Sequence, residues 1–355
     1  MADRKTLADL GGWPAILGTL TRGADLSPEQ ASAALAEVLE GEATPAQIAA
    51  FGVALRMKGE TAEELAALIR TLLEYAAPVP LPDELAGRVV DTAGTGGDRS
   101  GTINVSTLAA FVVAGAGAPV CKQGNRSASS ACGSADVLEA LGVTIDLGPA
   151  GVAACVEQVG MGFCFAPKFH AALRHAGPPR RELGVPTVFN FLGPLANPGR
   201  VRRQVLGVSD PAMAERMLGV LATNGSVRAL VFYGHDGLDE LSTTSTSTVF
   251  ELRDGEVRTY VVDPVELGVA RTTAEALRGG DAATNADLAR RVLDGEAGPH
   301  RDIVSLNAAA GLVAAGAADD LGDGLAAAQD SIASGAAAGV LDRLVAVSKE
   351  QAAAG

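Results

Sequence analysis

The segment best suited to chemistry is a glycine-rich loop that follows a short apolar stretch, Asp91-Thr92-Ala93-Gly94-Thr95-Gly96-Gly97-Asp98. Three glycines within four positions allow successive backbone N–H groups to turn toward one point, and such a nest binds anions. Arg99 stands where a dinucleotide-binding fingerprint needs its third glycine, and no Gly-Lys-Ser/Thr follows as in a Walker loop. The loop therefore predicts an anion site of another kind, and a mobile turn is the alternative.

Two polar segments come next along the chain. The first, Asn104-Val105-Ser106-Thr107, precedes a helical pattern, where its side chains can either cap the helix or hold a phosphate at its N-terminus. The second follows a predicted strand and runs Lys122-Gln123-Gly124-Asn125-Arg126-Ser127-Ala128-Ser129-Ser130. Open α/β sheets bind ligands at the carboxyl ends of their strands, so these cations, amides and hydroxyls predict phosphate and substrate contacts. A solvated turn is the alternative.

Two charged segments complete the set. Asp236-Gly237-Leu238-Asp239-Glu240 also follows a predicted strand, and adjacent carboxylates suit Mg²⁺, a hard cation that prefers oxygen ligands. Arg180-Arg181-Glu182, shortly before Asn190–Pro198, offers a guanidinium to a carboxylate ligand. Taken singly, these segments can equally be surface acids and an ion pair with Glu182. Taken together with the anion loop, they predict a site for a Mg²⁺-bound pyrophosphate ester.

The first 80 residues predict the helices of a separate domain. Three capping boxes occur in succession, each with a hydroxyl residue at the N-cap and Gln or Glu three positions later: Ser27 with Gln30, Thr44 with Gln47, and Thr61 with Glu64. Pro78, Pro80 and Pro82 then end the helical pattern. We therefore place a domain boundary at residue 82.

After residue 82 the pattern changes to strand, glycine loop and helix, which is typical of a mostly parallel sheet flanked by helices. The predicted strands are 88–91, 118–122, 161–166, 205–208 and 229–233, with a hairpin of 248–252 and 257–262 around Asp254-Gly255. The predicted helices are 106–116, 134–141, 149–159 and the alanine-rich last 50 residues. Residues 168–200 lose the strand pattern, and part of them is expected to rejoin the helical domain. The larger α/β domain then comprises 83–167 and 201–355.

Composition narrows the functional classes. The 355 residues carry 28 Lys and Arg against 42 Asp and Glu, a net charge of −14, which argues against general nucleic-acid binding. The longest apolar run, residues 108–120, is too short to span a bilayer, and the N-terminus lacks the apolar core of a signal peptide. Four cysteines fit no zinc or redox spacing, which predicts buried thiols. We expect a cytoplasmic protein that binds neither nucleic acid nor membrane.

With these motifs in order, the sequence resembles anthranilate phosphoribosyltransferases of tryptophan biosynthesis over nearly its whole length. The resemblance is carried by the glycine loop, by Asn104–Thr107, by Arg180–Pro198 and by Asp236–Glu240. Further matches are Gly124-Asn125-Arg126, the segment 133–142 and Phe165-Ala166-Pro167-Lys168-Phe169-His170. The resemblance implies transfer of the phosphoribosyl group of phosphoribosyl pyrophosphate to the amine of anthranilate, with two Mg²⁺ ions per site. It also implies a small helical domain beside a larger α/β domain and a homodimer joined through the helical domains.

The resemblance assigns roles residue by residue. The residues implied to bind phosphoribosyl pyrophosphate are Gly94, Thr95, Gly96, Gly97, Asp98, Thr102, Asn104, Ser106, Thr107, Lys122 and Ser129. Those implied to meet anthranilate or line its path are Gly94, Asn125, Arg180, Ala166, Pro167 and His170, with Arg180 facing the carboxylate. Ser106, Asp239 and Glu240 are the implied metal ligands, and no general base is assigned.

One position departs from the family, which usually has Lys-His-Gly-Asn-Arg where Gln123 stands here. Glutamine keeps a donor and an acceptor but takes up no proton near neutral pH. If the histidine only positions substrate, Gln123 can replace it; if its charge attracts the anionic acceptor, Gln123 weakens binding, and another aromatic amine is possible. The competing functions are a pyrimidine nucleoside phosphorylase of the same fold and a non-catalytic sensor of phosphoribosyl pyrophosphate.

Overall fold

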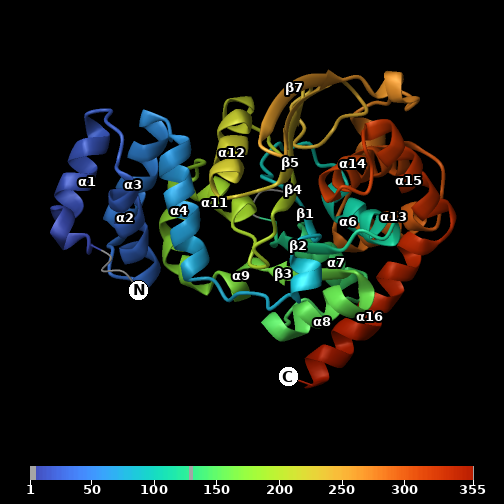
Figure 1. Ribbon diagram of the computed structural model, residues 1–355, viewed down its shortest axis with the longest axis horizontal. Coiled ribbons are helices and arrows are strands. Elements are labelled where there is room, and N and C mark those ends of the chain that lie inside the picture. Colours follow the sequence, from blue (N-terminus) through green and yellow to red (C-terminus); the bar gives the residue numbers. More distant parts are fainter. Residues whose placement is uncertain (1–4, 128–130, 355) are drawn as a thin grey trace.

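A computed structural model describes residues 5–127 and 131–354 of the chain. Its N-terminal part consists of helices, as predicted: η1 (Ala8–Leu10), α1 (Gly12–Thr21), α2 (Pro28–Glu40), α3 (Pro45–Lys58) and α4 (Ala62–Glu74). All three capping boxes are formed, so two backbone N–H groups at the start of each of α2, α3 and α4 are satisfied by side chains. These four larger helices form one end of the molecule (Figure 1).

The rest of the chain is built on one seven-stranded sheet. Its strands are β1 (Val90–Gly94), β2 (Val120–Gly124), β3 (Met161–Phe165), β4 (Arg203–Gly207), β5 (Arg228–Gly234), β6 (Ser247–Arg253) and β7 (Glu256–Val262). The strand order is β3-β2-β1-β4-β5-β6-β7. The first five strands are parallel to their neighbours, and β6 and β7 form the predicted antiparallel hairpin. The predicted fold class, a helical part beside a mostly parallel sheet flanked by helices, is confirmed.

Two strands begin later than the sequence pattern predicts. The prediction of 88–91 was wrong because Val89 still donates to Leu85 of the short helix α5 (Asp83–Ala86), so β1 starts at Val90. The prediction of 118–122 was wrong because Ala118 donates back to Val113 and closes the preceding helix, so β2 starts at Val120. In both cases an apolar residue that seemed to open a strand completes the end of a helix.

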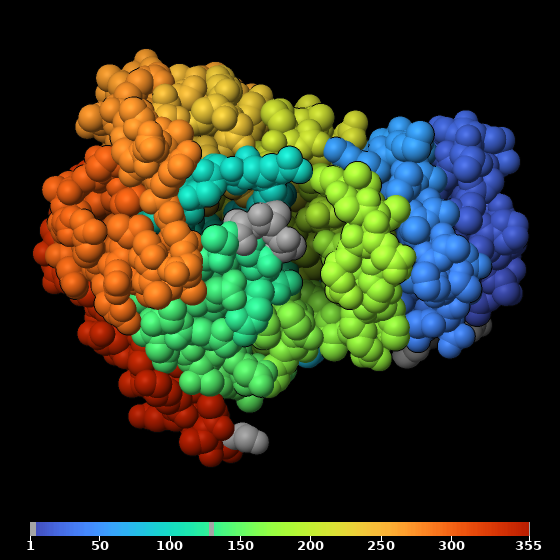
Figure 2. Space-filling model, turned by 180° about the vertical axis from the view of Figure 1, so that it is seen from behind, coloured from blue at the N-terminus to red at the C-terminus, as the bar shows by residue number. Residues whose placement is uncertain are grey.

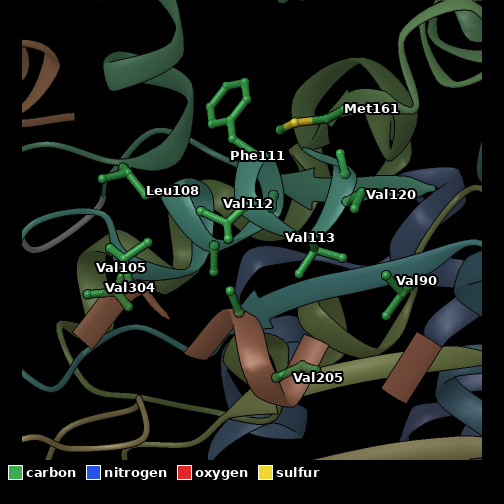
Figure 3. Packing of buried hydrophobic residues seen from close by; sticks show 14 of the residues in the cluster. Val90, Val105, Leu108, Phe111, Val112, Val113, Val120, Met161, Val205 and Val304 are labelled. Carbon is green, nitrogen blue, oxygen red and sulfur yellow. The ribbon is translucent and has the colours of Figure 1, made fainter. Parts of the chain in front are cut away.

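Helices cover both faces of the sheet. One face packs against α6 (Val105–Gly115) and α14 (Pro299–Ala315), and Val90, Val205 and the fully buried Phe111 belong to the same hydrophobic cluster (Figure 3). Burial of a Phe side chain contributes about 1.5–3 kcal/mol, so this layer holds α6 firmly on the strands. The other helices on the sheet or at its edges are α7 (Ser134–Ala140), α8 (Pro149–Val159), α12 (Pro211–Thr223), α13 (Ala282–Leu293), α15 (Leu321–Ala333) and α16 (Ala336–Ala354).

The segment without a strand pattern returns to the N-terminal helices. It forms α9 (Ala166–Phe169), η2 (Ala171–Ala176), α10 (Gly177–Leu183) and α11 (Phe189–Leu195). Phe189 packs edge-on against Phe51 of α3 with 6.4 Å between ring centroids, and Val188 and Leu192 lie in the same hydrophobic cluster. The second face of the sheet, with Leu206 and Val231, joins this cluster through α12. The predicted domain boundaries themselves stay a prediction.

The thiols of Cys121, Cys132, Cys155 and Cys164 are all buried and form no disulfide bond within the described residues, which confirms the predicted buried thiols. Within the described residues, no single helix has the length and apolar character needed to cross a membrane; the bent pair of α15 and α16 meets that test by length and composition only.

Candidate active site

The site forms where the strand order reverses, between β1 and β4. Ligands of open α/β sheets bind outside the carboxyl ends of the strands at such a point. The last residues of the two strands, Gly94 and Gly207, are register partners there. Both glycines are required by close approach: a Cβ at Gly94 would lie 2.6 Å from Asp239 Oδ2, and one at Gly207 would lie 1.6 Å from the Asp239 carbonyl oxygen. The segment that carries Asp239 therefore crosses directly over the ends of both strands.

Replacing Gly207 with alanine is expected to displace Asp239 and Glu240, since the new methyl group and the Asp239 carbonyl cannot share this space. Overpacking of this kind costs about 1–3 kcal/mol of stability, and we expect turnover to fall by about ten-fold or more. Gly219→Ala is the control, because its Cβ meets Ala62 at an ordinary 3.5 Å in the middle of α12. Thermal unfolding and Mg²⁺-dependent turnover of both variants test this; equal activity of the two variants would contradict it.

The predicted anion loop takes up its shape through the left-handed backbone of Gly96 and Gly97, whose φ angles are 66° and 85°. The Gly96 N–H donates to Asp239 Oδ2 over 2.7 Å, and the Thr95 N–H donates to the Gly207 carbonyl over 2.9 Å. Ser209 Oγ donates to the Gly96 carbonyl at 2.8 Å. The loop is thus held against the segment after β4 rather than standing free, which disfavours the mobile-turn alternative.

The N-terminus of α6 faces the same place. Asn104 occupies the N-cap position, but its side chain makes no capping hydrogen bond and donates instead to the Cys132 carbonyl at 3.1 Å. The Ser106 N–H donates to Glu240 Oε1 at 3.2 Å, and Lys122 Nζ lies 3.4 Å from Ser106 Oγ. Thr107 is buried in the first helical turn. The capping-only alternative is therefore not what this segment does, and Ser106, Lys122 and Glu240 come together as predicted.

Charge at the site is strongly concentrated and buried. Burial raises the pKa of Asp239 to about 7, helped by the neighbouring Asp98, and burial together with Asp239 raises the pKa of Glu240 well above its usual value. Burial lowers the pKa of Lys122, an effect that Asp91 opposes most and Glu240 and Asp239 oppose further. Four carboxylates, those of Asp91, Asp98, Asp239 and Glu240, thus interact around one buried ammonium group, that of Lys122. A bound cation would relieve the repulsion between them.

The oxygen donors here fit Mg²⁺. This ion is usually held by one or two protein carboxylates, while waters and substrate phosphates complete its coordination. Asp239 and Glu240 supply the carboxylates, and the nearby Ser106 hydroxyl can add a further oxygen. In the described part of the chain, no cluster of three or more His, Cys, Asp or Glu residues has the arrangement of a complete metal cage. A metal would therefore have to arrive with, or be completed by, a phosphorylated ligand.

The acceptor side of the site is marked by Arg180 on α10. Its guanidinium is half-buried, burial lowers its pKa, and no hydrogen bond or ion pair holds it among residues 5–127 and 131–354. The alternative ion pair with Glu182 is not formed between these described residues. A desolvated guanidinium without a protein carboxylate is a suitable partner for a carboxylate ligand.

Gln123 joins the acceptor side to the sheet. Its Nε2 donates to the Gly193 carbonyl of α11, and its Oε1 lies 3.4 Å from His170 Nε2. That contact places the ring proton of neutral His170 on Nε2. Burial lowers the pKa of His170 to about 4, so the ring is uncharged at neutral pH. Asn125, Ala166 and Pro167 lie at the ends of β2 and β3, where Asn125 and Pro167 are exposed and Ala166 is half-buried.

His170 should make stability depend on pH. Because the folded protein binds this proton less tightly than the unfolded chain, whose histidine pKa is about 6.5, the stabilisation is complete above pH 6.5 and is lost as the pH falls toward 4. At pH 5 the loss is about 2 kcal/mol. Urea unfolding at pH 7.5 and pH 5 should therefore show a smaller acid destabilisation for His170→Gln than for the wild type or His175→Gln. The same loss of stability at pH 5 in the wild type and both variants would refute the lowered pKa of His170.

Two predicted residues remain outside this arrangement. Thr102 pairs with Arg278 in an isolated bridge and lies close to Ser100 in the continuation of the glycine loop. Ser129 lies outside the described residues.

Asn307 was missed by sequence reasoning: it is buried on α14, where its Oδ1 accepts from the Leu241 N–H and its Nδ2 donates to the Leu241 carbonyl. The sequence signal that could have pointed to Asn307 is a single amide residue within an otherwise apolar helical segment.

Figure 2 shows the face of the molecule on which this site opens. The surface is hollowed between the cyan segment near residue 100, which continues from the anion loop, and the yellow-green segment near residue 180, which carries Arg180. The two ligand-binding halves predicted from the sequence thus lie on opposite rims of one depression.

Comparison with known proteins agrees with this geometry. The family described as "Glycosyl transferase family, a/b domain" matches residues 86–338, and "Glycosyl transferase family, helical bundle domain" matches residues 14–76. The chain is 56% identical over 337 residues to an anthranilate phosphoribosyltransferase of Rhodococcus jostii strain RHA1, covering 93% of this chain and 92% of that relative. The chain belongs to the anthranilate phosphoribosyltransferase family.

Solved structures of the family have the same fold. The anthranilate phosphoribosyltransferase of Thermus thermophilus superposes with a TM-score of 0.89 at 43% identity, covering 94% of this chain and 99% of that one. The Saccharomyces cerevisiae protein in complex with PRPP and Mg gives a TM-score of 0.85 at 26% identity, covering 95% and 98%. The same yeast protein has also been solved with 4-fluoroanthranilate. The predicted family is therefore confirmed.

Proposed function

We propose that this chain transfers the phosphoribosyl group of phosphoribosyl pyrophosphate to the amine of anthranilate, giving N-(5-phosphoribosyl)anthranilate and pyrophosphate in tryptophan biosynthesis. The observation that carries the proposal is the placement of Asp239 and Glu240 directly over an anion loop, beside a buried lysine. Support also comes from the family, whose yeast member binds PRPP, Mg and an anthranilate analogue.

The residues divide into two groups around the reacting carbon. The pyrophosphate group would be surrounded by Gly94–Asp98, and the phosphoribosyl group by Thr102, Asn104, Ser106, Thr107, Lys122 and Ser129. The carboxylate of anthranilate would meet Arg180, whose guanidinium has no protein partner among the residues described. Gly94, Asn125, Ala166, Pro167 and His170 would line the path of the acceptor.

Stabilisation of the leaving group is the main chemical task. Departure of pyrophosphate leaves positive charge on the ribose ring and adds negative charge to the leaving oxygens. The Thr95 and Gly96 N–H groups are used within the protein and hold the glycine loop in place. The other N–H groups of this loop and the Lys122 ammonium group are therefore positioned before the reaction and need little reorganisation when this charge develops. The anthranilate amine is neutral and weakly basic, so its lone pair needs no strong general base. What the reaction then needs is a correctly placed amine, and Arg180 would position it by holding the carboxylate of anthranilate.

Mg²⁺ would be held by Asp239 and Glu240, with Ser106 nearby and two ions per site. When bound, it would act as a Lewis acid toward the phosphate oxygens of the leaving group. The raised pKa values of the two carboxylates support this assignment, because an empty pair in this position is electrostatically unfavourable.

We further infer a cytoplasmic homodimer joined through the helical part. In this division, residues 1–82 and part of 168–200 form the helical domain, and 83–167 and 201–355 form the catalytic one. The exposed Met57 on α3 is consistent with such an interface. Sedimentation equilibrium of the wild type would give the oligomeric state.

The proposed function is tested by anthranilate fluorescence. Phosphoribosyl pyrophosphate, anthranilate and Mg²⁺ should give loss of the anthranilate signal, and excess EDTA should stop it. Phosphate and thymidine should give no thymine; release of thymine would instead indicate a nucleoside phosphorylase. Binding of phosphoribosyl pyrophosphate without turnover would indicate a sensor, or another aromatic amine as the acceptor, and would direct attention to Gln123.

A further inference from the structure

Asp91 is a buried carboxylate for which the proposed reaction has no direct use. It lies on β1, three residues before Gly94, and is completely shielded from solvent. Its Oδ1 accepts from the Gln123 N–H of β2 at 3.1 Å. Its Oδ2 accepts from Asn197 Nδ2 at 2.8 Å and from Gln204 Nε2 of β4 at 3.4 Å. One carboxylate thus receives donors from both neighbouring strands and from the segment after α11.

The three residues that supply these donors also hold backbone carbonyl groups. Gln204 Nε2 donates to the Pro194 carbonyl at 2.6 Å, and the Gln123 side chain donates to the Gly193 carbonyl. Asn197 Nδ2 donates to the Cys121 carbonyl at 2.8 Å, and its Oδ1 accepts from the Gly199 N–H. The Asp91 carboxylate therefore orients two amide side chains, those of Asn197 and Gln204, and holds the backbone of Gln123. Together these three residues fix residues 193–199 against β1, β2 and β4.

The cost of burying this group indicates a role beyond packing. An ionised carboxylate is expensive to remove from water, and an apolar residue of similar size would often be at least as stabilising. Burial raises the pKa of Asp91 to about 6, opposed chiefly by the charge of Lys122, so the group is ionised at pH 7.5. An acceptor-only group is what the geometry demands, because all three of its partners are donors.

We propose that Asp91 is a positioning residue for the amine acceptor. Through the Gln123 N–H it holds the strand residue whose side chain contacts His170. Through Asn197 and Gln204 it holds the end of α11 and the residues that follow it. The inference rests on the proposed function. Asp91 itself touches neither substrate. Its loss should therefore weaken the use of anthranilate, while the glycine loop and Lys122, whose charge Glu240 and Asp239 still support, continue to bind phosphoribosyl pyrophosphate.

Asp91→Asn tests this at constant size. Whichever way the new amide turns, its NH₂ group faces either the Gln123 N–H or the Asn197 and Gln204 donors, so part of the network must open. We expect the KM for anthranilate to rise by about ten-fold or more, with the KM for phosphoribosyl pyrophosphate unchanged within about three-fold. Both values come from the fluorescence assay with the other substrate saturating.

Glu64→Gln is the matched control. Glu64 is equally buried and accepts from the Leu26 and Thr61 N–H groups and from Lys58, but in the helical part away from the site. It should lower the unfolding temperature without changing either KM. A rise in the anthranilate KM for Asp91→Asn alone supports the proposal. Unchanged or equally raised KM values in the folded Asp91→Asn variant overturn it.

Asn197→Ala decides the question if Asp91→Asn does not fold. This variant removes one neutral partner of the carboxylate. It should show the same selective rise of the anthranilate KM, but by a smaller factor than Asp91→Asn. No change in either KM would overturn the proposal. Failure of the proposed function would look different, because the wild type itself would then show no turnover of anthranilate.

Discussion

Alanine at both Asp239 and Glu240 should abolish Mg²⁺-dependent turnover, with a loss of about 10³-fold or more. These are the two carboxylates that lie over the strand ends, and within the described chain no third acidic or histidine ligand completes a metal cage around them. Removing both should therefore leave Mg²⁺ bound only to the substrate and mispositioned. The measurement is initial rate against Mg²⁺ concentration at saturating substrates.

The chain offers a matched control for this double substitution. Asp83 and Glu84 are also an adjacent Asp-Glu pair, but both are exposed in the short helix α5. Asp83→Ala with Glu84→Ala changes the net charge equally and should retain wild-type activity. The variant lacking Asp239 and Glu240 should stay folded, and its stability should rise if anything, because it loses two buried like charges. Retention of full Mg²⁺-dependent activity would place the metal elsewhere.

Local signals allowed much of the fold to be predicted. A capping box lies within four consecutive residues, and all three boxes form. The Asp254-Gly255 hairpin also depends on adjacent residues, and Asp254 adopts the left-handed φ of 53° that such a turn needs. Strand starts were harder, because Val89 and Ala118 are apolar residues that complete helix ends through hydrogen bonds invisible in a hydrophobic pattern.

The candidate site was predictable in its parts but not in its connections. Each motif follows a strand, and the carboxyl ends of parallel strands meet at one edge, so the motifs had to approach one another. The sequence placed Lys122 at the last position of a predicted strand, at the start of a polar segment, whereas it lies in the middle of β2 and is fully buried. The partners of Asp91 are 32, 106 and 113 residues away in sequence, so no spacing rule could have joined them.

Gln123 shows how the structure changes the interpretation of a single residue. From sequence, it was either a neutral replacement for a positioning histidine or the loss of an attractive charge. In the fold its amide donates to the Gly193 carbonyl and lies next to neutral His170. Both hydrogen-bonding functions of the amide are thus engaged, which supports the positioning interpretation. On the acceptor side, Arg180 remains a partly buried cation without a partner among the described residues.

Arg180→Ala should consequently raise the KM for anthranilate by about 30-fold or more, since hydrogen bonds to a charged partner contribute about 1.5–3 kcal/mol. Its guanidinium is partly desolvated before substrate arrives, so little further desolvation opposes binding of a carboxylate. The KM for phosphoribosyl pyrophosphate should stay within about two-fold, because the groups assigned to it, the anion loop and the buried Lys122, lie on other elements than α10.

Arg181→Ala is the control for this change. Arg181 is the next residue on α10 and is exposed, so its removal alters the net charge identically without affecting the partly buried position. Aniline, which lacks the carboxylate, provides a second comparison: its weak use as an acceptor should be the same for the wild type and Arg180→Ala. An unchanged anthranilate KM for Arg180→Ala would refute the carboxylate contact. A large loss with aniline as well would instead show that Arg180 maintains the shape of the acceptor side rather than recognising the charge.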